Sequence, residues 1–485
     1  MENDFNICSP LGQELAEKAD VLESQRIMRE AEMVDLTLKH IAESVESRES
    51  DIMQVMAESK GQANAVREIV VHAIKDAAKG LIWCPEYQER AKSDQTMMLY
   101  VGTHWQTVES QQWKDFVGLC AQRCGITESQ LMNPAFMKLL YEATAFNMAT
   151  YQRQIIPDGQ VWLNMRNGTL VLSKDGKVEL REHRKEDLFR YVLGYSYIPD
   201  AECPQWHKFL DKVLPHEDAR RLLAEYFGYI FMPHHLLEKM LLLYGEGLNG
   251  KSVTLEIIEA LLGSTNISYL SLADLTTDDV KRASIEYKML NISHESGKDV
   301  NPNVLKQLTS GERGLIKNLY RAPRETNEYG KLIAAFNILP RAENTFGFFR
   351  RLLILPYEVT IPKEEIDRQL PAKLKEELPG ILNWVLQSLP SLMERREFSP
   401  CESSDKALEM YRLQADNVRL FLNEACEQSE STTQASQLYS DYQRFCIGAS
   451  LKPIGRNKFI ARLESLGYEP VLSGNLKYFK IKLAE

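Results

Sequence analysis

Long apolar runs and secretory features are absent from this sequence of 485 residues. No apolar stretch approaches the ~20 residues that a membrane-spanning helix needs. Glu2 and Asp4 make the start of the chain acidic, whereas a secretory signal begins with basic residues. We therefore expect a cytoplasmic protein that has no membrane partner.

Cysteine patterns typical of metal sites or disulfide frameworks are also missing. The eight cysteines are scattered along the chain, and Cys120 and Cys124 are the only close pair. No C-x-x-C spacing or Cys/His cluster accompanies them, so the sequence does not indicate a zinc module. It predicts reduced, mostly buried thiols.

Internal repeats and low-complexity tracts are lacking as well. The content of hydrophobic residues, 44 %, and of charged residues, 26 %, is close to that of globular proteins and excludes a disordered chain. The net charge of -10 does not exclude nucleic acid as a partner, because basic groups can gather locally. The length predicts three or four domains.

Four regions differ in their apolar spacing. Residues 1–84 show helical spacing without visible chemistry. In residues 85–220, strand-like runs flank Asn167-Gly168, a hairpin signal, which predicts a mixed accessory domain. In residues 221–398, short apolar runs alternate with helical segments, which predicts an α/β fold with a mostly parallel sheet. Residues 399–485 are expected to form a helical linker, two helices and a hairpin.

The apolar runs of the third region are the candidate strands of its sheet. They cover residues 240–244, 289–293, 332–336 and 352–355.

The strongest motif runs from Gly245 to Ser252 and reads G-x-x-x-x-G-K-S. A predicted strand precedes it and a predicted helix follows, as in a phosphate-binding loop. Lys251 would neutralise the β- and γ-phosphates, and Ser252 would ligate Mg²⁺. A glycine-rich turn with an accidental lysine is the alternative. The predicted nucleotide-binding residues are Gly245, Glu246, Gly247, Leu248, Asn249, Gly250, Lys251, Ser252 and Val253.

Residues 281–357 narrow the class of nucleotide-binding protein. Their motifs read MLNISHE from Met289 to Glu295, LKQLTSGER from Leu305 to Arg313, LIKNLYR from Leu315 to Arg321, LIAAFNILP from Leu332 to Pro340 and FFRRL from Phe348 to Leu352. In this order they resemble the superfamily 3 helicases, in particular the helicase half of phage, plasmid and poxvirus primase-helicases. The resemblance implies an AAA+ core that uses ATP and Mg²⁺. It also implies a hexameric ring that moves 3′ to 5′ on single-stranded DNA during replication of a mobile element.

The resemblance gives roles to the ends of two predicted strands. Glu295 is the candidate catalytic base and a candidate metal residue, and Asn337 would bridge the γ-phosphate and the attacking water. A buried structural asparagine is the alternative for Asn337. Many ATPases carry an acid just before the base, but Ser293 and His294 occupy those positions here, so metal support would come through water.

An arginine pair follows the candidate sensor. In the resembling family, an arginine at this place reaches the γ-phosphate that a neighbouring subunit holds, which would make Arg350 and Arg351 candidate catalytic residues. Adjacent side chains point in different directions. We slightly favour Arg351, and a surface salt bridge is the alternative for one of the two.

Candidate DNA contacts lie around a predicted hairpin of residues 315–320 and 326–333. Lys317, Arg321 and Arg324 would grip phosphates of single-stranded DNA in the pore of the ring. Taken alone, three cations near a turn more often form a solvated loop.

The flanking regions extend the resemblance to about residues 85–485. Residues 162–210 look like the domain that precedes the motor in phage and poxvirus primase-helicases. Fewer than 85 residues precede that region, so we expect no primase-polymerase domain and consider a separate primase as a partner. Residues 1–84 would dock that primase, help to form the ring or serve as an inert collar.

The last region resembles a winged helix, with predicted helices over residues 435–446 and 456–466 followed by strands around Gly474. Duplex origin DNA is the candidate partner and protein docking is the alternative. The candidate contacts are Arg456, Lys458, Arg462, Lys477 and Lys480.

Two other functions compete with the helicase. One is an ATP-regulated initiator that assembles on duplex DNA without unwinding it, and the other is a protein that interferes with a host replication partner. The pore cations and the arginine pair favour the motor, because a simple switch needs neither.

Overall fold

The computed structural model describes residues 28–29, 31–57, 62–85, 96–150, 152–294, 300–317, 323–339, 345–449, 451, 453–474 and 476–484. They belong to two units. Residues 1–171 and 178–197 form unit 1, and residues 172–177 and 198–485 form unit 2.

Helices and two small sheets make up unit 1. Its helices are α2 (Glu49–Ala57), α3 (Gln62–Ala78), α4 (Ser110–Arg123), α5 (Glu128–Leu131) and α6 (Pro134–Asn147), and its antiparallel sheet joins β1 (Ile82–Trp83), β2 (Met97–Tyr100) and β3 (Trp105–Val108). One hydrophobic cluster extends from Val34 to Met148. The helices on both sides of residue 84, where the sequence predicts a boundary, therefore share a core.

The hairpin predicted at Asn167-Gly168 is present in the second sheet. Strands β4 (Gln160–Met165), β5 (Gly168–Ser173) and β6 (Val178–Arg181) are neighbours in that order. The turn consists of Arg166 and Asn167, one residue earlier than expected. Asn167 Oδ1 accepts from the backbone N–H of Tyr197 at 2.9 Å, which fixes the turn.

Five parallel strands form the central sheet of unit 2, in the order β13-β7-β12-β9-β8. They are β7 (Met240–Tyr244), β8 (Ile267–Ser268), β9 (Leu290–His294), β12 (Lys331–Phe336) and β13 (Leu352–Pro356). Every residue of β12 is buried, as expected for a strand that is covered on both faces. The structure confirms the α/β class and the four predicted apolar strands, and it adds β8.

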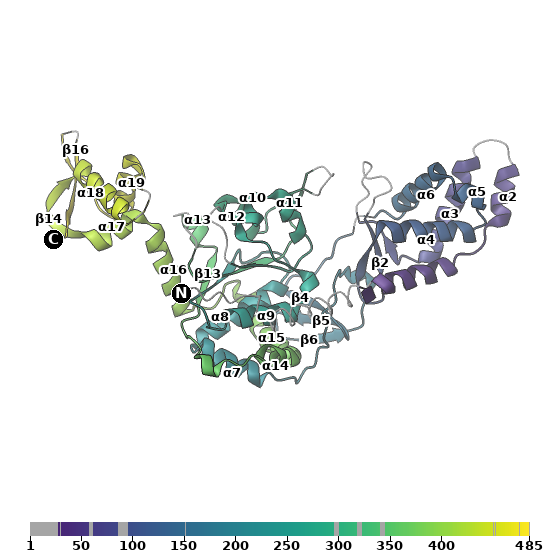
Figure 1. The fold of residues 1–485 in the computed structure, drawn as a ribbon, viewed down its shortest axis with the longest axis horizontal. Helices are drawn as coiled ribbons and strands as arrows, with labels where there is room; N and C mark the ends of the chain where they lie inside the picture. Colours follow the sequence, from purple (N-terminus) through teal and green to yellow (C-terminus); the bar gives the residue numbers. More distant parts are fainter. Residues whose placement is uncertain are drawn as a thin grey trace. The chain divides into compact units, whose positions relative to one another are not determined.

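Helices cover both faces of this sheet (Figure 1). They are α7 (Pro204–Val213), α8 (Glu217–Phe231), α9 (Lys251–Leu262), α10 (Leu272–Thr277), α11 (Asp279–Arg282), α12 (Pro302–Thr309), α13 (Phe346–Phe349), α14 (Leu370–Glu376), α15 (Leu378–Arg395) and α16 (Glu402–Ala415). Met240 and Leu242 of β7 pack in one cluster with Leu305 of α12, Phe349 of α13 and Tyr411 of α16. The fourth predicted region, from residue 399, therefore begins with a helix that packs against the central sheet of unit 2.

The parallel sheet has an amino edge, where its strands begin, and a carboxyl edge, where they end. The strands β7, β12 and β13 end at Tyr244, Phe336 and Pro356, which lie at the carboxyl edge. Lys331 and Leu352 begin β12 and β13 at the amino edge. In open α/β sheets, ligands bind beyond the carboxyl ends of the strands.

The predicted hairpin is shorter than expected. Strand β10 (Gly314–Ile316) pairs with β11 (Arg324–Thr326), and Ile316 lies opposite Arg324. The expected second strand over residues 326–333 is wrong, because residues 331–333 belong to β12 of the central sheet. The apolar run there is buried in the sheet and is not available for a hairpin.

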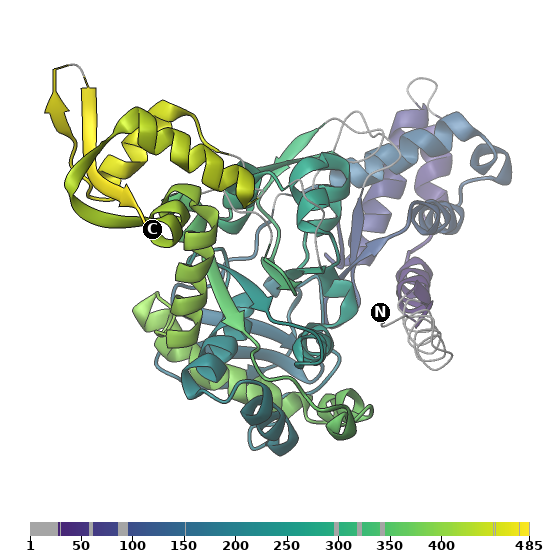
Figure 2. The same cartoon turned by 60° about the vertical axis from the view of Figure 1, so that its left-hand side comes forward.

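Three helices and a three-stranded sheet form the C-terminal part of the chain, drawn in yellow tones in Figure 2. They are α17 (Asn417–Ala425), β14 (Cys426–Gln434), α18 (Ala435–Gly448), α19 (Arg456–Ser465), β15 (Val471–Ser473) and β16 (Leu476–Leu483), with β16 between β14 and β15. Phe421, Tyr442, Phe459 and Phe479 are fully buried in its core. The two predicted helices and the hairpin are present, and α17 and β14 are additions.

Helix hydropathy and cysteine burial can be compared with what the composition suggested. Across the described ranges, no helix is both long and apolar enough to pass through a membrane. Cys124 is buried, and burial raises the pKa of its thiol to about 11. The Cys124 thiol therefore stays protonated near neutral pH.

Candidate functional site

The G-x-x-x-x-G-K-S motif forms the loop between β7 and α9. Gly245 and Gly250 have φ angles of +154° and +93°, which residues with a Cβ rarely adopt. A Cβ on Gly245 would lie 2.3 Å from the carbonyl oxygen of Tyr357, and one on Gly250 would lie 2.8 Å from Val213 Cγ1. Backbone conformation and packing therefore require glycine at both ends of the loop.

Lys251 is the buried cation at the centre of the loop. Its Nζ donates to the carbonyl oxygens of Gly245 and Glu246, at 2.5 and 3.0 Å. Asn249 Oδ1 and Asn337 Oδ1 each lie 3.2 Å from the same Nζ. Four oxygens thus surround an ammonium group that has three protons to donate. The ammonium group is hydrogen-bonded to neutral oxygen acceptors, which phosphate oxygens could replace.

Hydrogen bonds from the segment that follows β13 hold the loop in place. Asn249 Nδ2 donates to the carbonyl oxygen of Tyr357 at 3.1 Å, and Tyr357 Oη donates to Thr254 Oγ1 at 3.0 Å. The backbone N–H of Ile361 donates to the carbonyl oxygen of Leu248 at 2.7 Å. The sequence reasoning missed Tyr357. Its position directly after a predicted strand was the only signal that could have marked it.

Ser252 provides the hydroxyl at the start of α9 and is exposed. Within the described ranges, no three Asp, Glu, His or Cys side chains gather in a way that could hold a metal ion. A magnesium ion at this loop would therefore be held by a hydroxyl, by phosphate oxygens and by water. This donor set fits Mg²⁺, which keeps several waters and binds substrate phosphates.

Asn337 reaches the loop because β12 lies next to β7. It follows the last residue of β12, and its amide oxygen contacts Lys251 although the two are 86 residues apart in the sequence. Asn337 is exposed, which argues against the alternative of a buried structural asparagine. The structure thus brings together the predicted sensor and the predicted phosphate-binding lysine.

The end of β9 is described up to His294. His294 pairs with Ala335, two residues before Asn337, and Glu295 lies outside the described residues. Ser293 is buried, and its Oγ donates to the carbonyl oxygen of Leu270 at 2.7 Å. Ser293 therefore has a structural partner inside the sheet and does not replace the acid that many ATPases have at this position.

The arginine pair lies between α13 and β13. Arg350 Nη2 donates to Glu238 Oε2 at 2.8 Å, and 47 % of its side chain is exposed. Arg351 is 12 % exposed, and it donates to Ser310 Oγ at 2.9 Å and to the carbonyl oxygen of Gly347 at 2.6 Å. Of the two, Arg350 has the side chain that is accessible to a second molecule.

Both arginines lie at the opposite edge of the sheet from the phosphate-binding loop. Leu352 pairs with Met240 and Pro356 pairs with Tyr244, so β13 and β7 run side by side from end to end. The carbonyl oxygen of Arg351 accepts from the N–H of Met240 at 2.9 Å. A strand of five residues spans roughly 16 Å. Neither arginine therefore reaches the loop of its own chain.

The hairpin cations have different environments. Lys317 is exposed, directly after β10. Arg324 is half-buried and makes two hydrogen bonds to Glu286, one of them at 2.7 Å. Arg321 lies outside the described residues. The predicted contact at Arg324 has a structural partner, whereas Lys317 is accessible.

Exposed cations of the C-terminal part lie on α19 and β16. Arg456 and Lys458 are in the first turn of α19, and Lys480 is on β16. All three side chains are exposed.

Two other predicted DNA contacts take part in ion pairs. Arg462 Nε donates to the buried Asp416 at 2.8 Å, and Asp416 also caps the N-terminus of α17. Lys477 Nζ lies 2.5 Å from Glu464. Arg462 thus has a structural role, and Lys477 shares its charge with an acid of α19.

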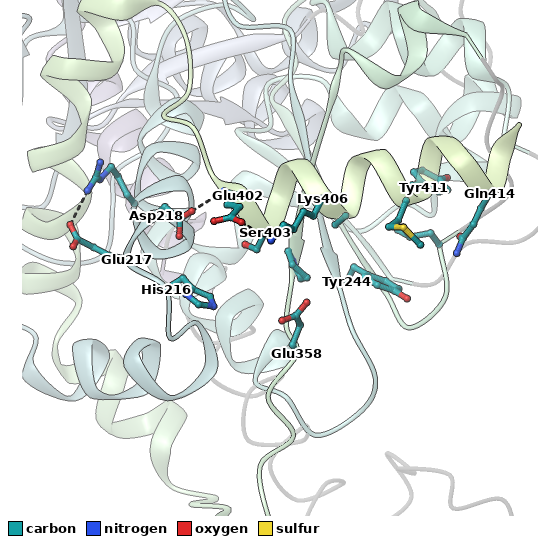
Figure 3. A pocket seen from close by; sticks show the side chains of 15 residues that line it. His216, Glu217, Asp218, Tyr244, Glu358, Glu402, Ser403, Lys406, Tyr411 and Gln414 are labelled. Carbon is teal, nitrogen blue, oxygen red and sulfur yellow. Dashed lines mark hydrogen bonds and ion pairs between the residues drawn. The ribbon is translucent and has the colours of Figure 1, made fainter. Parts of the chain in front are cut away.

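A cavity of about 910 Å³ adjoins the base of the loop, at the carboxyl ends of β7 and β13. Figure 3 shows Tyr244, the N-terminus of α8 and α16 around it. Its carboxylates belong to Glu217, Asp218, Glu358 and Glu402, and its cations to Arg221 and Lys406. Because acids outnumber bases, this cavity disfavours phosphate groups, which points to the Lys251 side of the loop as the place for an anion.

Solved protein structures resemble this chain over most of its length. Two solved structures that resemble it are apo structures of the NrS-1 C-terminal region. The first is 11 % identical, covers 84 % of this chain and 98 % of its own chain, and has a TM-score of 0.49. The second is 10 % identical, covers 80 % and 94 %, and has a TM-score of 0.46.

Two family models match parts of the chain. Residues 243–351 match a family of unknown function (DUF5906), which covers the loop, the sensor and the arginine pair. Residues 79–215 match the family described as D5 N terminal like. This match overlaps residues 85–220, for which the sequence predicts the accessory domain of the primase-helicases, and it agrees with the stated resemblance.

Proposed function

We propose that this protein is an ATP-hydrolysing DNA helicase of the superfamily 3 type, which works as a ring of identical subunits during replication of a phage, plasmid or other mobile element. ATP binds at the loop from Gly245 to Val253. Single-stranded DNA is the track, and hydrolysis takes place between two subunits.

The contact between Lys251 and Asn337 carries this proposal. A phosphate loop by itself is compatible with kinases and switches, whereas a polar side chain at the γ-phosphate end of the loop is needed to sense or position the attacking water. The strand order places β12 between β7 and β9, so that Asn337 lies beside Lys251 at 3.2 Å. Glu295, the residue after β9, is the proposed base.

The arginines support action between subunits. Because they lie at the amino edge, they can meet a γ-phosphate only on another copy of the chain. The exposure of Arg350 leads us to assign the finger to Arg350, although the sequence slightly favoured Arg351. Such a residue stabilises charge in the transition state and contributes about 10³ to 10⁵ in rate.

Magnesium fits the donor set at the loop. Ser252 supplies a hydroxyl, and Glu295 would support the metal through water. The bound ion would neutralise charge on the β- and γ-phosphates. Lys251 and the backbone N–H groups at the start of α9 would hold the same phosphates in place.

Two surfaces are proposed to bind DNA. Lys317, with Arg321 beyond it, would contact phosphates of a single strand from the β10–β11 hairpin. In the C-terminal part, the order of helices and strands resembles a winged helix, and Arg456 and Lys458 on its third helix would contact duplex DNA. Arg324 and Arg462 are less suited to contact DNA, because carboxylates of the same chain already bind them.

ATP hydrolysis by wild type and Lys251→Ala tests the proposal. We expect the variant to lose at least about 100-fold in turnover, because the buried donor at the phosphates is removed. Lys373→Ala is the control, since Lys373 forms an exposed ion pair with Asp367. Wild-type turnover in Lys251→Ala would refute the ATPase assignment.

Strand displacement separates the helicase from its alternatives. We expect the wild-type protein to release an oligonucleotide from a duplex that has a 3′ single-stranded tail, and to need ATP for it. ATP-dependent assembly on duplex DNA without strand release would favour an initiator. Hydrolysis without either activity would favour an interfering protein.

A further inference from the structure

The carboxylate of Glu238 binds the arginine pair from the loop before β7. Its Oε2 lies 2.8 Å from Arg350 Nη2 and 3.4 Å from Arg351 Nη2. Two adjacent arginines, whose side chains would ordinarily diverge, thus converge on one oxygen atom. A single carboxylate therefore contacts both guanidinium groups, and Arg351 is also held by Ser310 and Gly347.

The backbone at Glu238 is unusual. Its φ angle is +48°, a left-handed conformation that residues other than glycine rarely adopt. Its N–H donates to the carbonyl oxygen of His235 at 3.0 Å, which closes a turn just before the strand. Lys239, the next residue, donates from Nζ to the carbonyl oxygen of Arg350 at 2.6 Å. The turn that His235 closes and the hydrogen bond from Lys239 thus hold Glu238 beside the arginine pair.

A cationic cavity of about 370 Å³ opens at the same corner. Four cations line it, namely Lys239, Arg350, Arg395 and Arg396, against the carboxylates of Glu238 and Glu397. Arg395 is already paired with the buried Glu225, and the remaining excess of positive charge attracts an anion. The contact between Arg350 and Glu238 is exposed enough to exchange, because both side chains are at least 40 % accessible.

We infer that Glu238 is a positioning residue that occupies Arg350 in the separate subunit and is displaced by the γ-phosphate of ATP on a neighbouring copy. This inference rests on the proposed function. A phosphate carries more charge than a carboxylate and has more acceptor oxygens, so it competes successfully for the same guanidinium group. The exchange makes the association of subunits depend on bound ATP, because only a loaded neighbour supplies the replacing anion.

The dependence of ATP hydrolysis on protein concentration tests this inference, with the full chain and a single-stranded oligonucleotide present. Glu238→Gln keeps the shape of the side chain and removes its charge. We expect half-maximal specific activity at a protein concentration about two- to fivefold lower than in wild type, because an exposed ion pair no longer has to break.

Two further variants test whether the shift in concentration dependence comes from the contact between Glu238 and Arg350. Glu397→Gln removes a carboxylate from the same cavity and leaves Arg350 bound to Glu238, so its concentration dependence should match that of wild type. Adding Arg350→Ala to Glu238→Gln should abolish the gain, because the freed side chain is then missing. Melting curves of all variants control for folding.

A Glu238→Gln profile that coincides with wild type, or moves to higher concentration, would overturn the inference. Equal shifts in Glu238→Gln and Glu397→Gln would also overturn it, since the effect would then come from overall charge. A wild-type protein whose specific activity does not change on dilution would instead contradict the proposed function, so the two failures can be told apart.

Discussion

The two edges of the central sheet hold their cations differently. At the carboxyl edge, Lys251 is buried, and four oxygens from its own loop and from the end of β12 surround its ammonium group. At the amino edge, Arg350 is 47 % exposed and binds Glu238 through a single nitrogen. The first cation is fixed within the chain, whereas the second is available to a second molecule.

This difference explains how one chain could supply two halves of a site. A loop that cradles phosphate must exist before ATP arrives, because backbone N–H groups and a buried lysine act only if they are already oriented. A finger must change partners during the cycle, which requires exposure and a weak contact. The roles of the two edges can therefore be tested separately, by substituting residues at one edge at a time.

Substituting Arg350 at the amino edge should cause the largest loss of ATP turnover. We expect Arg350→Ala to bind ATP like wild type but to lose about 10³-fold in turnover, because charge in the transition state is no longer stabilised across the interface. The same change at Arg351 should cost less in turnover and more in thermal stability, since Arg351 bonds Ser310 and Gly347 within its own chain. Turnover, nucleotide affinity and melting temperature are the measurements.

Mixing two inactive variants shows whether the edges belong to different chains. Arg350→Ala retains an intact loop, and Lys251→Ala retains an intact finger. Mixed assemblies should recover part of the wild-type turnover, because some interfaces then pair the two intact halves. Absence of any recovery, in assemblies shown to contain both chains, would place the complete site within one chain.

The loop could be predicted from the sequence because its parts are contiguous. The strand before it, the glycines, Lys251 and the helix after it follow one another within about twenty residues. Asn337 required the family resemblance, because its contact with Lys251 depends on β12 lying next to β7. Nothing in the spacing along the chain determines which strands are neighbours.

Other parts of the site could not be predicted from local patterns. The expected hairpin strand over residues 326–333 failed because the apolar residues from 331 onward continue into β12, and an apolar run does not show which sheet it joins. Glu238 was missed because its partner Arg350 lies 112 residues later. The choice of Arg350 over Arg351 also needed the structure, since only contacts and exposure show which side chain is occupied within its own chain.

A smaller loss of turnover is expected at the carboxyl edge when Lys251 is retained and one of its hydrogen-bond acceptors is removed. Asn337→Ala removes the oxygen that lies 3.2 Å from Lys251 Nζ. We expect a loss of about 10- to 100-fold in kcat with little change in KM for ATP, because loop contacts to the nucleotide remain while the water loses an orienting group. Asn147→Ala, an exposed change in unit 1, is the control. A rise in KM without a loss in kcat would make Asn337 a binding residue instead.

A second buried lysine, Lys331 at the amino edge, can be compared with Lys251 at the carboxyl edge. Lys331 begins β12 at the amino edge, where its Nζ donates to the carbonyl oxygen of Met232 and lies 5.0 Å from the ring centroid of Tyr229. Burial lowers the pKa of Lys331 to about 7. Unlike Lys251, it has no predicted ligand, so its burial should act on stability alone.

The pH dependence of unfolding tests this distinction. In the unfolded chain a lysine titrates near 10.4, so between pH 7 and 10 the unfolded state binds more protons at this site than the folded state does. The contribution of Lys331 to the unfolding free energy therefore rises with pH in this window, by at most about 1.4 kcal/mol per pH unit. We expect Lys331→Met to be more stable than wild type at pH 7, with a difference in melting temperature that shrinks towards pH 9. The exposed change Lys373→Met should show no such trend, and a constant difference for Lys331→Met would mean that Lys331 stays charged in the folded protein.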